Sequence, residues 1–338
     1  MKSWITPVIL LFPVTALCQS GDSSSFYFAR GMDAMKEKRY VSALQALEKA
    51  TSINPKYTDA FIQCGFTNLE MKRIDPARFF FSKANELDPN NQIVIKEMTQ
   101  LLYNSHQYNK AIEFAKKCST CDNPERIMAL SYYQIEDYVN AEKQLRMVLA
   151  KSPNDAEANY TLGRNYIDME LYDKAGPYYE KAIQLDSSRS GWMYELGLLY
   201  YNNNNYKRAL NYFLKAADKG FPQGNDYYEN LGYANIYSGN FDEGERLLLL
   251  VFERKPGNKD ILRDLAEIYY QRKMYDRALT YCQKLVELDA KDGKALYQAG
   301  MCFQKKGQKD RGQQMCDKAI EMDPSLASQR QKMMSPGL

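Results

Sequence analysis

The residues that could carry out chemistry are few and scattered. The chain has a single histidine, His106, which excludes most triads, proton shuttles and histidine-based metal sites. The phosphate-binding loop, the Gly-x-Ser-x-Gly elbow, the His-Glu-x-x-His zinc motif and the calcium-binding loop do not occur in the sequence. We therefore expect no enzyme, no catalytic residue, no bound cofactor and no metal site, and we expect His106 to be a solvated turn residue.

Two cysteines have the spacing of redox and metal motifs. Cys118 and Cys121 are three residues apart, but two thiolates alone cannot complete a tetrahedral zinc site. Residues three apart at a helix end can reach the Cα separation of a disulfide, so the sequence favours a structural disulfide, with free thiols as the alternative. Four further cysteines occupy positions that take small or apolar side chains, which indicates buried thiols: Cys64, Cys282, Cys302 and Cys316.

The N-terminal segment has the features of an export signal. Lys2 precedes an apolar run, which ends at Cys18 before polar residues. This order predicts a secretory signal peptide over residues 1–18, too short to span a bilayer as a helix. We expect an exported protein in the periplasm or cell envelope of a Gram-negative bacterium. The alternative is an outer-membrane lipoprotein that carries its lipid on Cys18.

Charge and aromatic content limit the classes of function that the protein could have. Lys and Arg total 45 against 42 Asp and Glu, a formal net charge of +3. This balance argues against a nucleic-acid binder, and we expect no membrane insertion once the signal is removed. The 27 tyrosines far outnumber the 2 tryptophans, which indicates a repeated structural role for tyrosine.

A repeat accounts for nearly all of the chain after the signal. Two copies read Gly31…Ala43…Ala50…Pro55 and Gly65…Ala77…Ala84…Pro89. Small residues at fixed places allow two helices of one unit to approach closely, and each unit needs its neighbour to bury both faces. We identify nine copies, at 24–57, 58–91, 92–121, 122–155, 156–189, 190–224, 225–258, 259–292 and 293–326.

The pattern resembles the tetratricopeptide repeat family, whose 34-residue unit carries Leu-Gly-x2-Tyr, Ala-x3-Phe and Pro. The resemblance implies an all-α, right-handed α-solenoid of about nine helix-turn-helix repeats. We expect a signal peptide at 1–18, a short linker at 19–23, the array at 24–326 and a C-terminal cap or tail at 327–338. The third unit is about four residues short, so we also expect a kink near Cys118–Pro124 that divides the array into two lobes.

The resemblance further implies that the first helix of each unit lines a concave groove that binds a protein or an extended peptide. Tyrosine would supply rigid contact area and arginine a bidentate grip on carboxylates, although packing inside the repeat explains any single tyrosine equally well. The groove positions are Tyr103, Arg126, Tyr133, Tyr160, Arg164, Tyr194, Tyr201, Tyr233, Tyr237, Arg263 and Tyr270.

The function that follows is an exported scaffold or adaptor for protein–protein interaction, in envelope assembly or secretion. Two alternatives stay open. One is a lipoprotein assembly factor anchored through Cys18, and the other is a glycan- or small-molecule-binding protein that uses the tyrosine-rich groove. The oligomeric state is not predicted.

Overall fold

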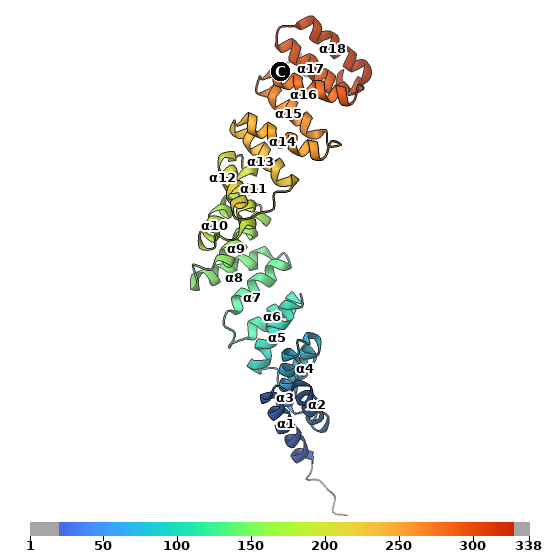
Figure 1. Ribbon diagram of the computed structural model, residues 1–338. Coiled ribbons are helices and arrows are strands. Elements are labelled where there is room, and N and C mark those ends of the chain that lie inside the picture. Colours follow the sequence, from blue (N-terminus) through green and yellow to red (C-terminus); the bar gives the residue numbers. More distant parts are fainter. Residues whose placement is uncertain (1–19, 328–338) are drawn as a thin grey trace, which may run out of the picture. The chain divides into compact units, whose positions relative to one another are not determined.

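The computed structural model describes residues 20–327, and these residues form helices without any strand (Figure 1). The helices are α1 (Ser20–Lys36), α2 (Tyr40–Ile53), α3 (Thr58–Glu70), α4 (Ile74–Leu87), α5 (Gln92–Asn104), α6 (Tyr108–Lys117), α7 (Pro124–Gln134), α8 (Tyr138–Lys151), α9 (Ala156–Asp168), α10 (Tyr172–Leu185), α11 (Ser190–Asn202), α12 (Tyr206–Asp218), α13 (Asn225–Ser238), α14 (Phe241–Arg254), α15 (Asp260–Gln271), α16 (Tyr275–Leu288), α17 (Gly293–Lys305), α18 (Lys309–Met322) and the 3-10 turn η1 (Pro324–Leu326). The predicted signal peptide and residues 328–338 lie outside the described residues. Helix α1 begins at Ser20, inside the segment expected to be a linker.

The helices of residues 20–327 follow one another as helix-turn-helix pairs, from α1–α2 to α17–α18. The first helix of a pair packs on the second, and the second packs on the first helix of the following pair within the same unit. The prediction of an all-α solenoid of helix-turn-helix repeats is confirmed.

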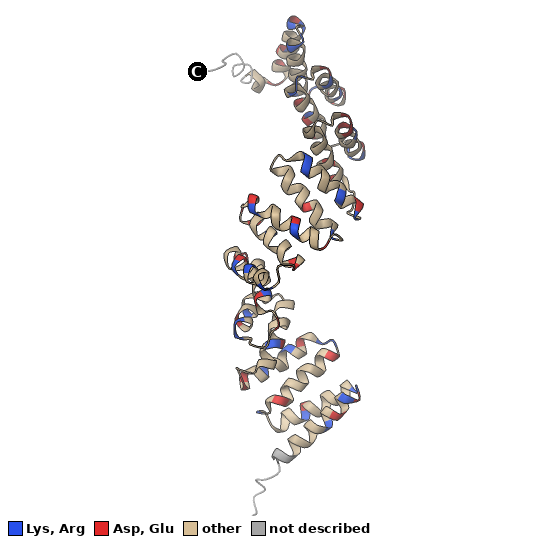
Figure 2. Ribbon diagram, turned by 90° about the vertical axis from the view of Figure 1, so that its left-hand side faces the viewer, with Lys and Arg blue, Asp and Glu red and all other residues tan. Residues whose placement is uncertain are grey.

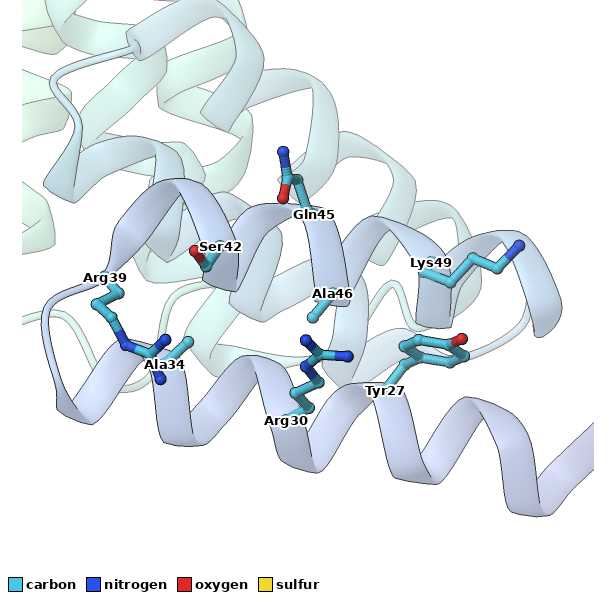
Figure 3. A pocket seen from close by; sticks show the side chains of 8 residues that line it. All are labelled: Tyr27, Arg30, Ala34, Arg39, Ser42, Gln45, Ala46 and Lys49. Atoms are coloured by element: carbon cyan, nitrogen blue, oxygen red, sulfur yellow. The ribbon is translucent and has the colours of Figure 1, made fainter.

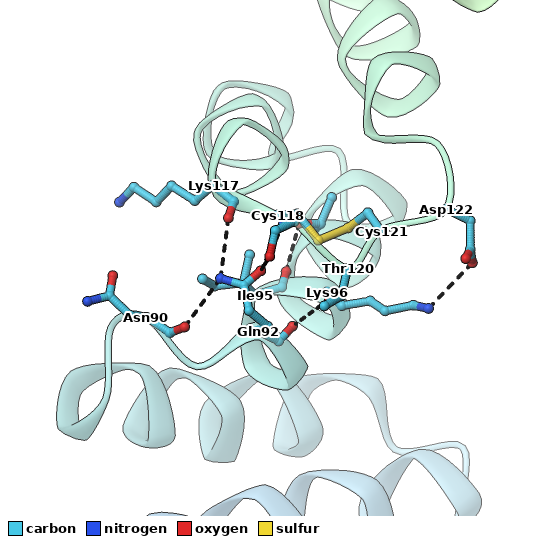
Figure 4. Close-up of a disulfide and its surroundings, with 11 residues drawn as sticks. Asn90, Gln92, Ile95, Lys96, Lys117, Cys118, Thr120, Cys121 and Asp122 are labelled. Carbon is cyan, nitrogen blue, oxygen red and sulfur yellow. Dashed lines mark hydrogen bonds and ion pairs between the residues drawn. A yellow bond between two sulfur atoms is a disulfide. The ribbon is translucent and has the colours of Figure 1, made fainter. Parts of the chain in front are cut away.

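The chain divides into two compact units, Met1–Leu185 and Asp186–Leu338. The expectation of a division near Cys118–Pro124 was wrong. The short third unit loses length from α6, which has 10 residues, while α6 keeps its packing against α7. Cys118 and Cys121 form a disulfide just after α6, and the loop between them is fastened to Gln92 at the start of α5 (Figure 4). Because the shortened unit is held in this way, stacking continues through it.

Packing within a pair depends on a glycine in the first helix and a large side chain in the second. A Cβ atom on Gly163 would lie 2.6 Å from Cδ2 of Tyr179, and one on Gly197 would lie 2.6 Å from Cδ1 of Phe213. Real Cβ atoms do not approach so closely, so the aromatic ring occupies the space that any other residue would fill. The spacing of glycine and aromatic residue in the sequence thus sets the distance between the two helices.

The turn inside each pair contains a residue with a left-handed backbone. These residues are Lys38, Lys72, His106, Glu136, Glu170, Asn204, Gly239, Lys273 and Gly307. Only two of them are glycine, although glycine adopts this conformation at the lowest cost. His106 has φ of 57° and is exposed, and its Nδ1 lies 2.6 Å from the hydroxyl of Tyr108.

Part of the tyrosine excess is buried in the core. Tyr166 and Tyr269 are fully buried, one in each unit. Tyr166 donates a hydrogen bond to Glu142 at 2.8 Å, and Tyr269 donates one to Glu245 at 2.7 Å. The two units therefore use the same device, a buried ring whose hydroxyl is satisfied by a glutamate on an earlier second helix.

Candidate functional site

All eleven predicted groove residues lie on first helices of pairs, and none is fully buried. We call this set the first-helix surface. In the first unit it comprises Tyr103 of α5, Arg126 and Tyr133 of α7, and Tyr160 and Arg164 of α9. In the second unit it comprises Tyr194 and Tyr201 of α11, Tyr233 and Tyr237 of α13, and Arg263 and Tyr270 of α15. Lysine, arginine, aspartate and glutamate are interspersed along both units (Figure 2).

The two arginines Arg126 and Arg263 bind carboxylates of this chain. Arg126 is paired with Asp155 and lies 3.7 Å from Glu157. Arg263 is paired with Asp292 at 2.7 Å. Asp155 and Asp292 also cap the next first helix, since each accepts a hydrogen bond from a backbone N–H in its first turn. Both arginines therefore link successive repeats, and their guanidinium groups are already paired with carboxylates of this chain.

Several tyrosines of the surface brace the turn of their own pair. The ring of Tyr103 lies 5.9 Å from that of Tyr108, and the ring of Tyr270 lies 5.7 Å from that of Tyr275. In both cases a residue near the end of a first helix contacts the first residue of the second helix. The edge-to-face arrangement is favourable for aromatic pairs. These two tyrosines have a packing role that needs no ligand.

Arg164 forms the centre of the first unit's surface. Its guanidinium carbon lies 5.8 Å from the ring centre of Tyr133 and 6.0 Å from that of Tyr160. The hydroxyl of Tyr133 donates a 2.6 Å hydrogen bond to Asp168. Burial and this bond raise the pKa of Tyr133. We call Tyr133, Tyr160 and Arg164 the first-unit cluster, a cation held between aromatic rings.

Tyr194 packs inside the second unit. Its ring stacks on Phe221 with centres 4.2 Å apart, and its hydroxyl accepts a hydrogen bond from Asn230 at 2.8 Å. Phe221 belongs to the extra residues that lengthen the sixth repeat. Tyr194 therefore anchors that insertion.

Three predicted residues come together around a hollow of about 390 Å³ in the second unit. We call it the second-unit hollow. Its lining consists of Tyr201, Tyr233, Tyr237, Asp264, Glu267, Ile268, Gln271 and Arg272. The tyrosines come from α11 and α13, and the last turns of α15 supply most of the other residues.

The hollow is held open by hydrogen bonds and ring contacts. Tyr233 donates a 2.6 Å hydrogen bond to Asp264, and burial together with this bond raises the pKa of Tyr233. The ring of Tyr237 stacks on Tyr206 with centres 4.8 Å apart. The rings are thus fixed before any ligand arrives, which lowers the entropy cost of binding.

Asp264 and Arg272 were not among the sequence candidates. The repeat pattern identified fixed positions on one face of each first helix. Asp264 and Arg272 line the hollow from positions outside that set. The repeat pattern gave no signal for either residue: Asp264 directly follows Arg263, and Arg272 follows the last residue of α15, Gln271.

Comparison of the sequence with models of known protein families identifies the family of this chain. Models described as tetratricopeptide repeat match residues 34–91, 156–189, 194–243, 235–299 and 293–326. The chain belongs to the tetratricopeptide repeat family. Repeats of this family bind proteins or peptides and serve as scaffolds.

The relatives are distant and larger. DnaJ protein P58IPK homolog B of Oryza sativa subsp. japonica is 24% identical over 235 residues, covering 64% of this chain and 49% of the relative. Protein O-mannosyl-transferase TMTC1 of Homo sapiens is 29% identical over 164 residues, covering 48% of this chain and 18% of the relative. The chain thus spans about half the length of these curated relatives, or less.

The chain is also similar to a solved structure. YrrB, described as a TPR protein with an unusual peptide-binding site, is 24% identical over 56% of this chain and 97% of its own, with a TM-score of 0.41.

The first tetratricopeptide repeat contains a second hollow of about 420 Å³, between α1 and α2 (Figure 3). Its lining includes the cations Arg30, Arg39 and Lys49 together with Tyr27. Figure 3 shows Arg30 and Tyr27 reaching from α1 toward α2. Arg39 donates a 2.6 Å hydrogen bond to Glu37. The lining of this hollow is basic, whereas carboxylates outnumber cations in the second-unit hollow.

The cysteines of the repeats are placed as follows. Cys118 and Cys121 are joined, with Cα atoms 5.6 Å apart. Ser119 donates to the Oε1 atom of Gln92 from its backbone N–H and from its hydroxyl, both at 2.8 Å. The other four cysteines of the repeats are buried thiols. A hydrogen bond with Cys302 and burial raise the pKa of the Cys282 thiol, so these two cysteines face each other as thiols.

Among the helices of residues 20–327, none combines the length and apolarity needed to cross a bilayer. The same stretch contains no group of three or more His, Cys, Asp or Glu side chains placed to hold a metal ion.

Proposed function

We propose that this protein is a non-enzymatic scaffold that binds an extended segment of another protein along its first-helix surface. The second-unit hollow carries the proposal. Three tyrosines from two successive repeats line one open hollow there, and their rings are held by contacts within the chain. Half-buried tyrosines supply contact area and hydroxyl groups at low entropy cost.

Other residues of the first-helix surface already have partners within their own unit. Arg126, Arg263 and Tyr194 are engaged in contacts between or within repeats. The lining of the hollow contains no serine, threonine, cysteine, lysine or histidine, and burial and the bond to Asp264 raise the pKa of Tyr233; this supports binding rather than catalysis.

We also propose that the scaffold works outside the cytoplasm, as an adaptor in the envelope of a Gram-negative bacterium. The support is the order of charged, apolar and small residues over 1–18. Cell fractionation and the mass of the mature N-terminus test this, with a Cys18→Ala variant to separate cleavage from lipid attachment. An unprocessed protein found in the cytoplasm would refute the export proposal but leave the scaffold proposal standing.

Cross-linked pull-down tests the binding surface. The first variant combines Tyr233→Ala and Tyr237→Ala, whose rings are 6.5 Å apart at the hollow. The matched control combines Tyr200→Ala and Tyr212→Ala, another stacked and half-buried pair, with rings 5.7 Å apart and outside the hollow. We expect a partner that the wild type and the control recover and the hollow variant loses, with helicity unchanged by circular dichroism. Equal recovery by both variants would place binding elsewhere.

A further inference from the structure

The second-unit hollow has an excess of negative charge. Asp264 and Glu267 line it from α15, and Arg272 is the one cation in its lining. Glu229 lies one helical turn before Tyr233 on α13, and its pKa is raised by burial and by the charges of Asp226 and Asp264. The lining therefore contains two carboxylates and one guanidinium, and Glu229 lies close enough to Asp264 for the two charges to interact.

Neutral groups hold the carboxylates that line the hollow. Asp264 accepts from the hydroxyl of Tyr233. Glu267 accepts from the amides of Gln271 at 2.7 Å and of Gln298 at 2.9 Å. Within residues 20–327, neither Asp264 nor Glu267 forms an ion pair. Their positions are thus fixed while their charge is not neutralised, and a bound cation would not have to displace an internal one.

The aromatic lining is suited to the same ligand. The faces of tyrosine rings attract cations electrostatically, most often the guanidinium of arginine. Arginine is also planar, so it can stack on a ring while its N–H groups reach carboxylates at the ring's edge. Tyr201, Tyr233 and Tyr237 lie close enough to Asp264 for its charge to raise the pKa of all three.

We propose that the second-unit hollow binds a cationic side chain, arginine in preference to lysine, on an extended segment of the partner protein. This inference rests on the proposed scaffold function and specifies its partner's chemistry. The carboxylates are exposed, so the contact gives selectivity and moderate affinity. An acidic segment is disfavoured at this position by the charges of Asp264 and Glu267.

A linear peptide library of random 12-residue sequences, displayed on phage and panned on the protein, provides the probe. We expect the selected peptides to share a basic residue. One of them is then synthesised with arginine or with citrulline, which keeps the shape and loses the charge, and its affinity is measured by fluorescence anisotropy. Citrulline should weaken binding by roughly tenfold.

A double-substituted protein, Asp264→Asn with Glu267→Gln, isolates the contact because the amides keep the shape of the hollow. This variant should bind the arginine and citrulline peptides equally. The control variant Tyr200→Ala with Tyr212→Ala should keep the tenfold difference.

The outcomes separate the two proposals. Neutral or acidic peptides that are selected and lost with Tyr233→Ala would overturn the cationic inference and uphold the scaffold function. A tenfold difference that persists in the Asp264→Asn, Glu267→Gln protein would also overturn it, by placing the arginine elsewhere. If no peptide is selected, the scaffold proposal falls and the inference falls with it.

Discussion

The first-unit cluster and the second-unit hollow occupy the same face of the repeat and contain the same aromatic residue, yet they present opposite charges. In the first unit, Arg164 lies between the rings of Tyr133 and Tyr160. In the second unit, the rings of Tyr201, Tyr233 and Tyr237 surround a hollow bordered by Asp264 and Glu267. The cluster holds its cation against the rings, whereas two carboxylates and one guanidinium, that of Arg272, border the hollow.

The comparison distinguishes residues that the repeat fold requires from residues that can vary between repeats. The tyrosines Tyr103 and Tyr270 brace turns in both units, so tyrosine on this face is partly a requirement of the fold. The charged residues around the rings differ between the two units, although Asp168 and Asp264 each accept a hydrogen bond from a tyrosine. Binding chemistry is therefore determined by the charged residues beside the repeat pattern rather than by the pattern itself.

The largest expected effect is on stability, and it should be similar for core substitutions in the two units. Tyr166→Ala and Tyr269→Ala each remove a fully buried ring and one hydrogen bond to a glutamate. We expect each to cost about 3–5 kcal/mol of unfolding free energy, measured by urea titration. If one variant alone lost less than about 1 kcal/mol of unfolding free energy, the two cores would not be stabilised in the same way.

Reversing the charge of the hollow should make it resemble the first unit. Asp264→Lys with Glu267→Lys places two cations where the carboxylates lie. We expect the preference to change from arginine peptides to acidic ones, with a loss of roughly tenfold or more for the former. Fluorescence anisotropy measures both, and unchanged preference would show that the hollow does not contact the ligand.

Removal of the charge of Arg164 in the first-unit cluster should have little effect on the affinity for basic peptides. Arg164→Ala removes a cation between two rings and should cost about 0.5–1 kcal/mol of stability, measured by urea titration. Affinity for the arginine peptide should stay within about twofold. A large loss of that affinity would move the binding site to the first unit.

The smallest effect concerns Glu229. Its pKa is raised in the folded protein, chiefly by burial, so the folded state holds a proton more tightly than the unfolded state. Stability from this group should therefore fall as pH rises from the unfolded pKa, about 4.3, through the higher folded value. Glu229→Gln should remove that slope and be slightly more stable at pH 7, as thermal unfolding at several pH values can measure. A variant less stable than wild type at pH 7 would contradict this sign.

The sequence predicted the fold because each repeat position has a steric reason. Gly163 and Tyr179 show this, since the ring takes the space that a Cβ atom would need. The division after Leu185 could not be predicted from repeat lengths, because the short third repeat is compensated by a shorter α6 and a fastened loop.

The site was predicted only in part. The family pattern identified Tyr201, Tyr233 and Tyr237, but it identified Arg126 and Arg263 equally, and these are used between repeats. Each arginine precedes its aspartate by the same interval, 29 residues, so this use was visible in the sequence. The acidic border of the hollow was not, because it depends on which side chains of α13 and α15 meet.

Site-specific photo-cross-linking tests the central claim most directly. A benzophenone amino acid replaces Tyr237 at the hollow or, in the control, Tyr212 outside it, and the cross-linked segment is identified by mass spectrometry from native envelope extract. The account predicts an adduct from position 237, with a segment that contains a basic residue, and none from position 212. Adducts from position 212 alone, or a segment at 237 without a basic residue, would contradict it.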